Sequence, residues 1–535
     1  YGFSKHVPDI NIRTPKTAVI GTDEFEYFID RNNLRDFVLI EDNYEIIKER
    51  FISSRLTETL SKRLKIILRK INNPIAIRSS GLFEDSLMQP FAGIFETYLL
   101  PNNHPDPNVR LQQVMDAIKL VFASVYSDVA RGYFKAVNYK IEEEKMAVII
   151  QQIVGEEYNG RFYPVVSGVA QSYNFYPISH MEPEEGIVQL ALGLGPLIVE
   201  GGQVYRFSSK YPEMNPPFSN AVEFLKKSQN VFYALETKNS PQNIGIDEKF
   251  NLKKYSLDKA EDDGTLFFVA STFSGQDNAI KDTISVEGPR VITFANILKH
   301  GLFPLAEILN EILEIGKKSF GSHIEIEFAI NLSRDKGRIP EFHLLQIRPM
   351  VAGGEPVEIE MGGKDPSDII CSTLHPMGNG RISDIRDIVY IDPEKFNISQ
   401  SRKIALEIEN INKKIVDEDR KYVLIGFGRW GTSDPWLGIP VEWHQISGAK
   451  VVIESFIKDF RIDPSLGSHF FHNMISLQMG YFHINDKVED EYINWELLQR
   501  QKPETETKYI KHLRFDDPLS IIIDAKNSKG KIYLP

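Results

Sequence analysis

Apolar residues recur at every third or fourth position in four segments of the chain, and this spacing predicts amphipathic helices. The four segments are residues 58–71, 110–126, 305–318 and 400–416. Shorter apolar or alternating runs between them predict strands. These runs lie at residues 16–20, 74–78, 146–154, 165–170, 265–271, 324–331, 342–350, 387–391, 422–425 and 449–453. Helices and strands are therefore mixed along the chain, which predicts an α+β fold.

The clearest domain boundary is a glycine-rich stretch at residues 351–367, which contains Gly353-Gly354 and Gly362-Gly363. Paired glycines weaken regular structure and are typical of linkers. We expect a domain at residues 1–355 with an insertion at about 208–290, a linker at 356–367, a second domain at 368–490 and a C-terminal extension at 491–535. The extension ends in a predicted hairpin that turns at Asn527-Ser528-Lys529-Gly530.

Composition narrows the class of protein. The 535 residues include 62 Lys and Arg against 74 Asp and Glu, which gives a net charge of −12. A net anion is not attracted to nucleic acid or to anionic lipid, so we expect no nucleic-acid partner and no membrane partner. The single cysteine, Cys371, excludes an internal disulfide framework and a cysteine-rich zinc site. Because neither a signal peptide nor an apolar run of ~20 residues is visible, we expect a soluble, cytoplasmic enzyme.

Two neighbouring predicted strands carry the clearest candidate site. Side chains alternate across a strand, so Glu325 and Glu327 share one face, and Gln346 and Arg348 share a face of the next strand. If the apolar faces of both strands pack in the core, two carboxylates, an amide and a guanidinium meet on one surface. Oxygen ligands of this kind suit Mg²⁺, and the arginine suits a phosphate. From these residues alone a solvated sheet face with an Arg–Glu ion pair is the alternative.

A second candidate lies at the end of the predicted strand at 74–78. Arg78 ends this strand and is followed by Ser79-Ser80-Gly81, so a positive charge and backbone N–H groups could face a phosphate. The chain has no Walker A pattern, so a nucleotide site would be of another type. An ordinary Ser/Gly turn is the alternative for this segment. The glycine-rich runs at 191–195 and 200–202 are equally weak on their own.

Taken together, these segments resemble a known family. The runs IAIRSSGLFEDSLMQPFAGIFETYL, MAVIIQQIVG, VSGVAQS, ALGLGPLIVEGG, IEIEFAIN and LLQIRPM are similar to the nucleotide-binding domain of phosphoenolpyruvate synthase and pyruvate phosphate dikinase, in the same order and approximate spacing. The resemblance covers about residues 15–352. It implies an ATP-grasp fold in which two subdomains hold ATP between them, followed here by a smaller α/β domain.

The resemblance also implies roles for individual residues. The nucleotide-binding set that it implies is Arg78, Ser79, Gln151, Glu200, Glu325 and Arg348. Within this set, Arg78 and Arg348 would grip phosphates during catalysis. The metal ligands for Mg²⁺ would be Glu327 and Gln346. The metal face expected from strand alternation thus coincides with the metal site of the family.

The phosphates and the adenine have further expected neighbours. The resemblance implies that Glu325 lies near the metal and the phosphates, and that Gln151 lies beside the adenine. The family also begins with a Gly-Gly-Lys motif whose lysine contacts phosphate. This chain opens with Tyr1-Gly2-Phe3-Ser4-Lys5, in which Lys5 is a poor match. Truncation of the chain or an altered site would each explain the difference.

Residues 378–485 resemble a distant swivelling domain, which in relatives carries phosphate on a histidine between ATP and a substrate in a (β/α)₈ barrel. The likeness rests on Gly378-Asn379-Gly380-Arg381, Thr432-Ser433-Asp434-Pro435-Trp436 and Gly467-Ser468-His469. It implies that His469 accepts a phosphoryl group, because a neutral imidazole is nucleophilic near pH 7. The family's His-Ala-Ala is His469-Phe470-Phe471 here, so a structural histidine is the alternative, and His472 is the second choice.

The stretch Gly426-Phe427-Gly428-Arg429-Trp430-Gly431 matches the G-x-G-x-x-G dinucleotide pattern after a strand. That motif must open a helix, whereas Asp434-Pro435 and Ile439-Pro440 interrupt the segment that follows. We therefore expect a tight turn rather than an NAD site. The residues after His469 are too few for a barrel of about 250 residues, so we do not expect the complete pyruvate-converting reaction from this chain.

Two functional hypotheses follow. The first is an ATP- and Mg²⁺-dependent phosphotransferase that passes a phosphoryl group from ATP to a histidine or to an unknown acceptor. The second is a nucleotide sensor that binds ATP without turnover and signals through domain closure. The metal-ligand set favours the enzyme, whereas the missing Gly-Gly-Lys motif and the altered histidine motif favour the sensor. A homodimer is compatible with either hypothesis.

Overall fold

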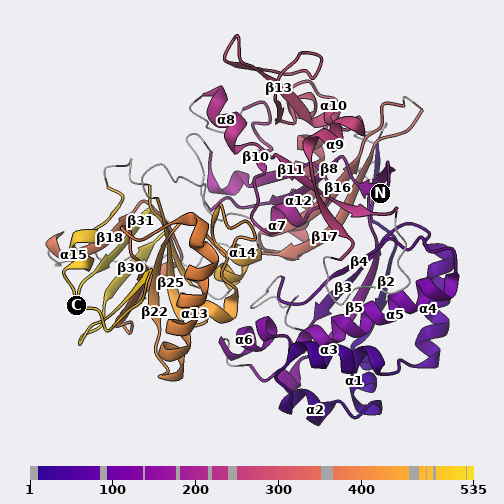
Figure 1. Ribbon diagram of the computed structural model, residues 1–535. Helices are drawn as coiled ribbons and strands as arrows, with labels where there is room; N and C mark the ends of the chain where they lie inside the picture. Colours follow the sequence, from indigo (N-terminus) through magenta and orange to yellow (C-terminus); the bar gives the residue numbers. More distant parts are fainter. Residues whose placement is uncertain are drawn as a thin grey trace.

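The computed structural model arranges the chain in three bodies (Figure 1). It describes residues 10–82, 84, 93–136, 139–175, 181–214, 220–238, 250–335, 337–350, 366–456, 469–476, 479–485, 488, 490–525 and 527–535. We call the first body lobe 1 (residues 17–152), the second lobe 2 (residues 156–349 together with 11–13) and the third the C-terminal unit (residues 366–535). In Figure 1 lobe 2 lies above lobe 1, and the C-terminal unit lies beside both.

Lobe 1 combines a four-stranded antiparallel sheet with helices. Its strand order is β2 (Thr17–Ile20), β5 (Met146–Gln152), β3 (Ile75–Gly81) and β4 (Tyr98–Leu100). Its α-helices are α1 (Thr22–Arg31), α2 (Arg35–Ile40), α3 (Tyr44–Ser53), α4 (Glu58–Lys70), α5 (Pro107–Ala123) and α6 (Asp128–Ala136). The predicted helix at 58–71 is α4. The Thr57 hydroxyl caps its first turn, and Leu60, Leu64 and Leu68 bury one face in the core.

Lobe 2 is built on a six-stranded sheet. Its order is β1 (Asn11–Arg13), β17 (Glu341–Pro349), β16 (Ile324–Asn331), β8 (Val166–Gln171), β9 (Ile187–Ala191) and β10 (Tyr205–Phe207). Helix α12 (Leu305–Phe320) packs against this sheet, and its Ile308 and Leu309 belong to the same buried cluster as Ile324 and Ile326. The helix ends at Gly321, whose φ of 68° lies in the left-handed region that favours glycine.

Two smaller sheets complete lobe 2, and the segment predicted as an insertion contributes strands to both of them. One has the order β12 (Leu252–Ser256), β11 (Val231–Glu236), β7 (Arg161–Tyr163) and β6 (Glu156–Tyr158), and the other β14 (Ala279–Lys281), β13 (Ala270–Ser274) and β15 (Arg290–Ile292). The predicted strand at 265–271 is wrong, because helix α10 (Leu266–Val269) precedes β13. A short apolar run does not distinguish a buried helix from a buried strand.

The described part of the C-terminal unit contains two main sheets, a short two-stranded sheet, and the helices that cover one of the main sheets. The larger sheet has the order β19 (His375–Met377), β26 (Gly480–His483), β25 (Ala449–Ser455), β22 (Tyr422–Phe427), β21 (Asp387–Ile391), β29 (Ile510–Arg514) and β28 (Thr505–Glu506). Its middle strands β26, β25, β22 and β21 are parallel. The smaller sheet has the order β20 (Asn379–Ile382), β30 (Ser520–Asp524), β31 (Lys529–Tyr533), β18 (Ile369–Thr373) and β27 (Tyr492–Ile493).

Strand β21 shows how the two faces of the larger sheet are used. Its Ile388 and Tyr390 belong to the buried cluster shared with the smaller sheet. Its Val389 and Ile391 belong to the cluster that contains Ile404, on helix α13 (Ser401–Asp417). Both faces of the strand are therefore buried, which explains its continuous apolar sequence.

The last strands of the chain belong to both sheets of this unit. Strand β29 pairs with β21, β30 with β20, and β31 with β18. Strands β30 and β31 form the predicted hairpin. The residues predicted as a C-terminal extension therefore complete the two sheets.

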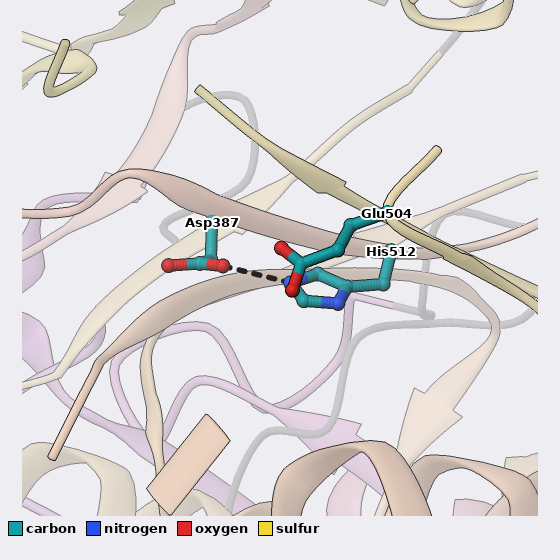
Figure 2. A group of neighbouring side chains, drawn as sticks. All are labelled: Asp387, Glu504 and His512. Carbon is teal, nitrogen blue, oxygen red and sulfur yellow. Dashed lines mark hydrogen bonds and ion pairs between the residues drawn. The ribbon is translucent and has the colours of Figure 1, made fainter. Parts of the chain in front are cut away.

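A cluster of charges, in which Asp387 and His512 are buried and Glu504 is exposed, lies toward the edge of the larger sheet. Asp387, Glu504 and His512 offer ligand atoms within 4.8 Å of one another, a spacing that a metal ion could use (Figure 2). However, Asp387 Oδ1 already accepts hydrogen bonds from His512 Nε2, at 2.7 Å, and from Arg420. These two donors occupy the carboxylate oxygen that a metal would need.

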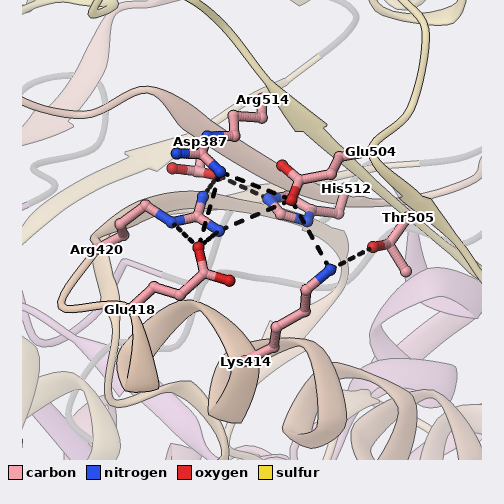
Figure 3. Close-up of polar contacts among 8 residues, drawn as sticks. All are labelled: Asp387, Lys414, Glu418, Arg420, Glu504, Thr505, His512 and Arg514. Carbon is pink, nitrogen blue, oxygen red and sulfur yellow. Dashed lines mark hydrogen bonds and ion pairs between the residues drawn. The ribbon is translucent and has the colours of Figure 1, made fainter.

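Positive side chains also surround the second carboxylate of this cluster. Lys414, Arg420 and Arg514 each place a nitrogen 3.8–3.9 Å from Glu504 Oε1 (Figure 3). Cations at these positions oppose the binding of a metal ion. The cluster is therefore an ion-pair network that connects the end of α13 to β21 and β29.

The network predicts that Asp387→Asn destabilises the C-terminal unit by about 1.5–3 kcal/mol, because it removes the buried anion that accepts hydrogen bonds from His512 and Arg420. Burial raises the pKa of Asp387, but the hydrogen bonds from His512 and Arg420 outweigh that effect and hold the pKa below its usual value. The stability that Asp387 contributes is therefore present in full above about pH 4, which is the pKa of an aspartate in the unfolded chain. It is lost as the pH falls further. Thermal unfolding of both proteins between pH 3 and pH 7 measures it. Asp517→Asn, at an exposed site, is the control, and equal stability of wild type and Asp387→Asn at pH 7 would contradict the prediction.

Candidate nucleotide site

A cavity of about 720 Å³ lies where lobe 1 meets lobe 2. Its lining residues are Thr14, Pro15, Thr17, Arg78, Ser79, Glu84, Ile149, Gln151, Phe320, Leu344, Leu345, Gln346, Ile347, Arg348 and Pro349. Strands β3 and β5 of lobe 1 supply one wall, and strand β17 of lobe 2 supplies another. The volume is in the range of pockets that bind cofactors and nucleotides.

Strand pairing places the four predicted metal-face residues side by side. In the antiparallel register of β16 and β17, Glu325 lies opposite Arg348, and Glu327 lies opposite Gln346. All four side chains share the face opposite to Ile324 and its buried neighbours, as the alternation predicted. A β-bulge follows directly, between Glu327 and Phe328, and it adds an extra residue to β17 at this point.

Arg348 balances the charge of this face. Its Nη2 lies 2.5 Å from Glu327 Oε1, and its Nε lies 3.4 Å from Glu325 Oε1. Glu325 and Arg348 are only 6% and 9% exposed, so the ion pairs are largely shielded from water. Burial raises the pKa of Glu325, and the charge of Arg348 and a hydrogen bond from Gln171 oppose that rise.

Gln171 is a site residue that the sequence analysis did not identify. Its Nε2 donates to Glu325 Oε2 at 2.7 Å, from the neighbouring strand β8. It is 4% exposed. The one feature of the sequence that could have indicated Gln171 is its place as a long polar residue at the end of a strand of small and apolar residues.

Arg78 connects the two walls of the cavity. Its Nη1 donates to Gln151 Oε1 at 3.3 Å within lobe 1, and its Nη2 donates to Gln346 Oε1 in lobe 2. Gln151 Nε2 also crosses between the lobes and donates to the Leu345 carbonyl at 3.2 Å. Ser79 follows Arg78 on β3 and lines the cavity as well. Of the residues expected at the nucleotide and the metal, five line this one cavity: Arg78, Ser79, Gln151, Gln346 and Arg348. Glu325 and Glu327 lie beside Arg348 and Gln346 in the strand register but are not among the lining residues.

Glu200 is placed differently from these residues. It is not among the residues that line the cavity. Its Oε2 accepts hydrogen bonds from Tyr233, at 3.1 Å, and from Ser433 of the C-terminal unit, at 2.9 Å. Glu200 thus takes part in a contact between lobe 2 and the C-terminal unit, and its predicted role in nucleotide binding stays a prediction.

His469 is the first residue of helix α14 (His469–Ser476), and its side chain lies outside the described part of the structure, as do those of Lys5 and His472. The two residues that follow it are core residues. Phe470 stacks on Trp443 with ring centroids 4.4 Å apart, and Phe471 packs on Tyr481 at 5.6 Å. The departure from His-Ala-Ala therefore has a structural cause, because these rings fix α14 on the larger sheet.

The glycine pattern at 426–431 does not form a dinucleotide site. Strand β22 ends at Phe427, and the short strand β23 (Arg429–Trp430) follows and pairs with β24 (Gly438–Ile439). Among the described residues no helix begins at this pattern, so the structure lacks the helix N-terminus that binds a pyrophosphate.

Residues 3–362 match the family model described as pyruvate phosphate dikinase, AMP/ATP-binding domain. The chain belongs to this family. The predicted resemblance and the predicted α+β fold of ATP-grasp type are thereby confirmed. The match ends before the C-terminal unit begins, so the swivelling role of that unit stays a prediction.

Three relatives illustrate the similarity. The chain is 30% identical over 190 residues to an uncharacterized phosphotransferase, YvkC, of Bacillus subtilis, which covers 35% of this chain and 20% of the relative. It is 24% identical over 215 residues to phosphoenolpyruvate synthase of Aeropyrum pernix, a match that covers 36% of this chain and 24% of the relative. It is 32% identical over 133 residues to phosphoenolpyruvate synthase of Deinococcus radiodurans, a match that covers 24% of this chain and 14% of the relative. The chain therefore matches a quarter or less of the length of these relatives.

None of the helices described in the structure has the length and apolar character needed to cross a membrane.

The family implies Mg²⁺ beside the nucleotide, and the residues present fit such an ion. Glu327 and Gln346 are register partners on adjacent strands, so a carboxylate and an amide oxygen lie on one face beside the cavity. Mg²⁺ takes one or two ligands of this kind and completes its shell with phosphates and water. In this structure Arg348 contacts Glu327 Oε1 and Arg78 donates to Gln346 Oε1, so both arginines would have to turn toward the phosphates before these oxygens bind an ion.

The cavity predicts that Arg78→Ala weakens the binding of MgATP about 10- to 100-fold. Hydrogen bonds to a charged group contribute about 1.5–3 kcal/mol, and this change removes them from the phosphates as well as from Gln346. Isothermal titration calorimetry measures the affinity. Arg69→Ala removes an exposed arginine of α4 and is the matched control. Wild-type affinity in Arg78→Ala would mean that the nucleotide binds elsewhere.

Proposed function

We propose that the protein is an ATP- and Mg²⁺-dependent phosphotransferase of the phosphoenolpyruvate synthase and pyruvate phosphate dikinase type. It binds ATP in the cavity between the lobes and transfers a phosphoryl group to His469 or to another acceptor. One observation carries the proposal: Arg78 of lobe 1 meets Gln346 and Arg348 of lobe 2 at this cavity, and Glu327 lies beside Gln346 in the strand register.

The two arginines orient the phosphates. Arg78 exchanges its neutral contact with Gln346 for charge-assisted hydrogen bonds to phosphate oxygens, which are roughly twice as strong. Arg348 holds phosphate from the opposite wall, while Glu325 and Gln171 keep its guanidinium in place. Mg²⁺ at Glu327 and Gln346 would supply further positive charge against the phosphates. Closure of the lobes excludes water, which favours transfer to the acceptor over hydrolysis.

His469 is the proposed acceptor within the chain. An unprotonated ring nitrogen attacks the phosphorus, the P–N bond forms, and the P–O bond to the departing nucleotide breaks with its electron pair on oxygen. The position of α14 supports this role. Phe471 packs on Phe175 of lobe 2 with ring centroids 5.9 Å apart, and Phe175 follows Gln171 by only four residues. Helix α14 therefore begins close to the strand end that supports Glu325.

A nucleotide sensor without turnover is the second candidate. It is favoured by the packing of Phe470 between Trp443 and the backbone at Gly431, which holds the start of α14 in the core. In this case ATP would bind in the same cavity and no phosphate would reach the protein.

The deciding experiment uses MgATP labelled separately at the β- and γ-phosphates and follows acid-labile phosphate on the protein. We expect label on the wild type, none on His469→Ala, and none on Glu327→Ala or after chelation of Mg²⁺. The position of the label identifies the phosphate that moves.

His300→Ala is the matched control, because His300 is an exposed histidine of lobe 2. It should retain full labelling. Label on His469→Ala would exclude His469 as the acceptor. Tight ATP binding without any label on the wild type would favour the sensor.

A further inference from the structure

The C-terminal unit contacts both lobes that form the cavity, and its contact with lobe 1 is apolar. Helix α6 of lobe 1 packs on the 3₁₀-helix η7 (Trp443–Ile446) of the C-terminal unit. At Gly132 the two backbones lie so close that a Cβ atom would be 2.4 Å from His444 Cβ and 2.9 Å from His444 Cα. Buried side chains of α6, such as Tyr133, belong to one continuous cluster with Ile446. Lobe 1 and the C-terminal unit therefore share a core and move together.

The contact with lobe 2 is partly polar and includes the aromatic contact of Phe471 with Phe175. Arg429 of β23, which is 5% exposed, donates from Nη1 to the carbonyl oxygens of Gly201 and of Gly202, the latter at 3.1 Å. Ser433 adds hydrogen bonds to Glu200, from its hydroxyl at 2.9 Å and from its backbone N–H at 3.4 Å. Figure 1 shows α6 of lobe 1 and α7 (Pro196–Val199) of lobe 2 both on the side that faces the C-terminal unit.

The turn that Arg429 holds lies next to the metal face. It follows α7, whose Leu197 packs in a small buried cluster with Val169. Val169 is the register partner of Glu327 on the neighbouring strand. A displacement of this turn therefore acts on the strands that present the metal ligand.

Local packing fixes Arg429 in position. The Trp430 N–H donates to Glu454 at 2.9 Å, and the indole donates to the Ile453 carbonyl at 3.0 Å. Glycine is required at Gly438, because a Cβ atom there would be 2.0 Å from the Arg429 carbonyl oxygen. The packing of the glycine-rich segment thus fixes the position of Arg429.

We propose that Arg429 is a positioning residue that holds the nucleotide cavity closed. Because the C-terminal unit moves with lobe 1, separation of the lobes must break the hydrogen bonds from Arg429 to Gly201 and Gly202. It also breaks the contacts of Ser433 and Phe471 with lobe 2, and the direct hydrogen bonds of Arg78 and Gln151 between the lobes. The contact with lobe 2 is the one that opens, since separating α6 from η7 would expose the buried cluster that lobe 1 shares with the C-terminal unit. This inference rests on the proposed function only in taking ATP as the occupant of the cavity.

The test is the dissociation rate of a fluorescent ATP analogue, measured by stopped flow. Arg429→Ala should raise this rate about tenfold, and Arg429→Lys should restore part of the loss. Arg402→Ala, at an exposed arginine of α13, is the control and should leave the rate unchanged. Unchanged dissociation from Arg429→Ala would overturn the proposal.

Gly132→Ala tests the other half of the connection. Alanine favours the helix but cannot fit against His444, so it should loosen the C-terminal unit from lobe 1 and raise the rate to a similar extent. The double variant should be no faster than either single variant, because either change alone breaks the connection between the lobes that runs through the C-terminal unit. Additive effects would mean two local defects and would overturn the proposal.

A measurement without nucleotide separates this inference from the proposed function. Cysteines introduced at exposed positions, Arg63→Cys in lobe 1 and Lys318→Cys in lobe 2, accept a donor and an acceptor dye, while the native Cys371 is fully buried. Energy transfer should report a longer and broader distance between the lobes in Arg429→Ala than in wild type. Equal distances would exclude the closing role, whatever ligand the cavity binds.

Discussion

The antiparallel register between β16 and β17 controls the chemistry of the cavity. It sets Glu325 against Arg348 and Glu327 against Gln346, and it sends Ile324 and Ile326 to the opposite face. Because side chains alternate, a slip by one residue would bury the charged set and expose the apolar set. Helix α12 prevents such a slip, since it covers the apolar face and loses its packing if the strand shifts. Hydrophobic burial on one face therefore specifies the position of the polar site on the other.

Charge balance on this face links the site to the separation of the lobes. Arg348 satisfies two carboxylates that would otherwise be buried without a counterion, a state that costs several kcal/mol. Arg78, from the other lobe, completes the arrangement through Gln346. A phosphate that enters the cavity meets arginines from both walls, so its binding strengthens the same closure that Arg78 and Gln151 already favour. Phosphate binding and closure of the two lobes are thus coupled, because each favours the other.

The sequence predicted the shared face of Glu325, Glu327, Gln346 and Arg348 better than the surroundings of that face, for a physical reason. Alternation within a strand is a local property, so the metal face could be derived from short runs of residues. Gln171 depends on which strand lies next to β16, and the contact of Glu200 with Ser433 joins residues 233 positions apart in the chain. Such contacts leave no local pattern. The same limit explains the error at 265–271 and the role of β28–β31, because the neighbours of a strand decide whether a segment completes a sheet.

The glycines at 426–431 match a nucleotide-binding pattern but have a packing role in this structure. In a dinucleotide site such glycines let a backbone approach a pyrophosphate, whereas here they let a backbone approach aromatic rings. A Cβ atom at Gly426 would lie 2.2 Å from the Trp430 ring, and one at Gly431 would lie 2.0 Å from the Phe470 ring. Both rings are buried, and Phe470 belongs to the helix that His469 begins. The same turn therefore positions Arg429 against lobe 2 and α14 against the sheet, so any motion that releases one contact changes the surroundings of the other.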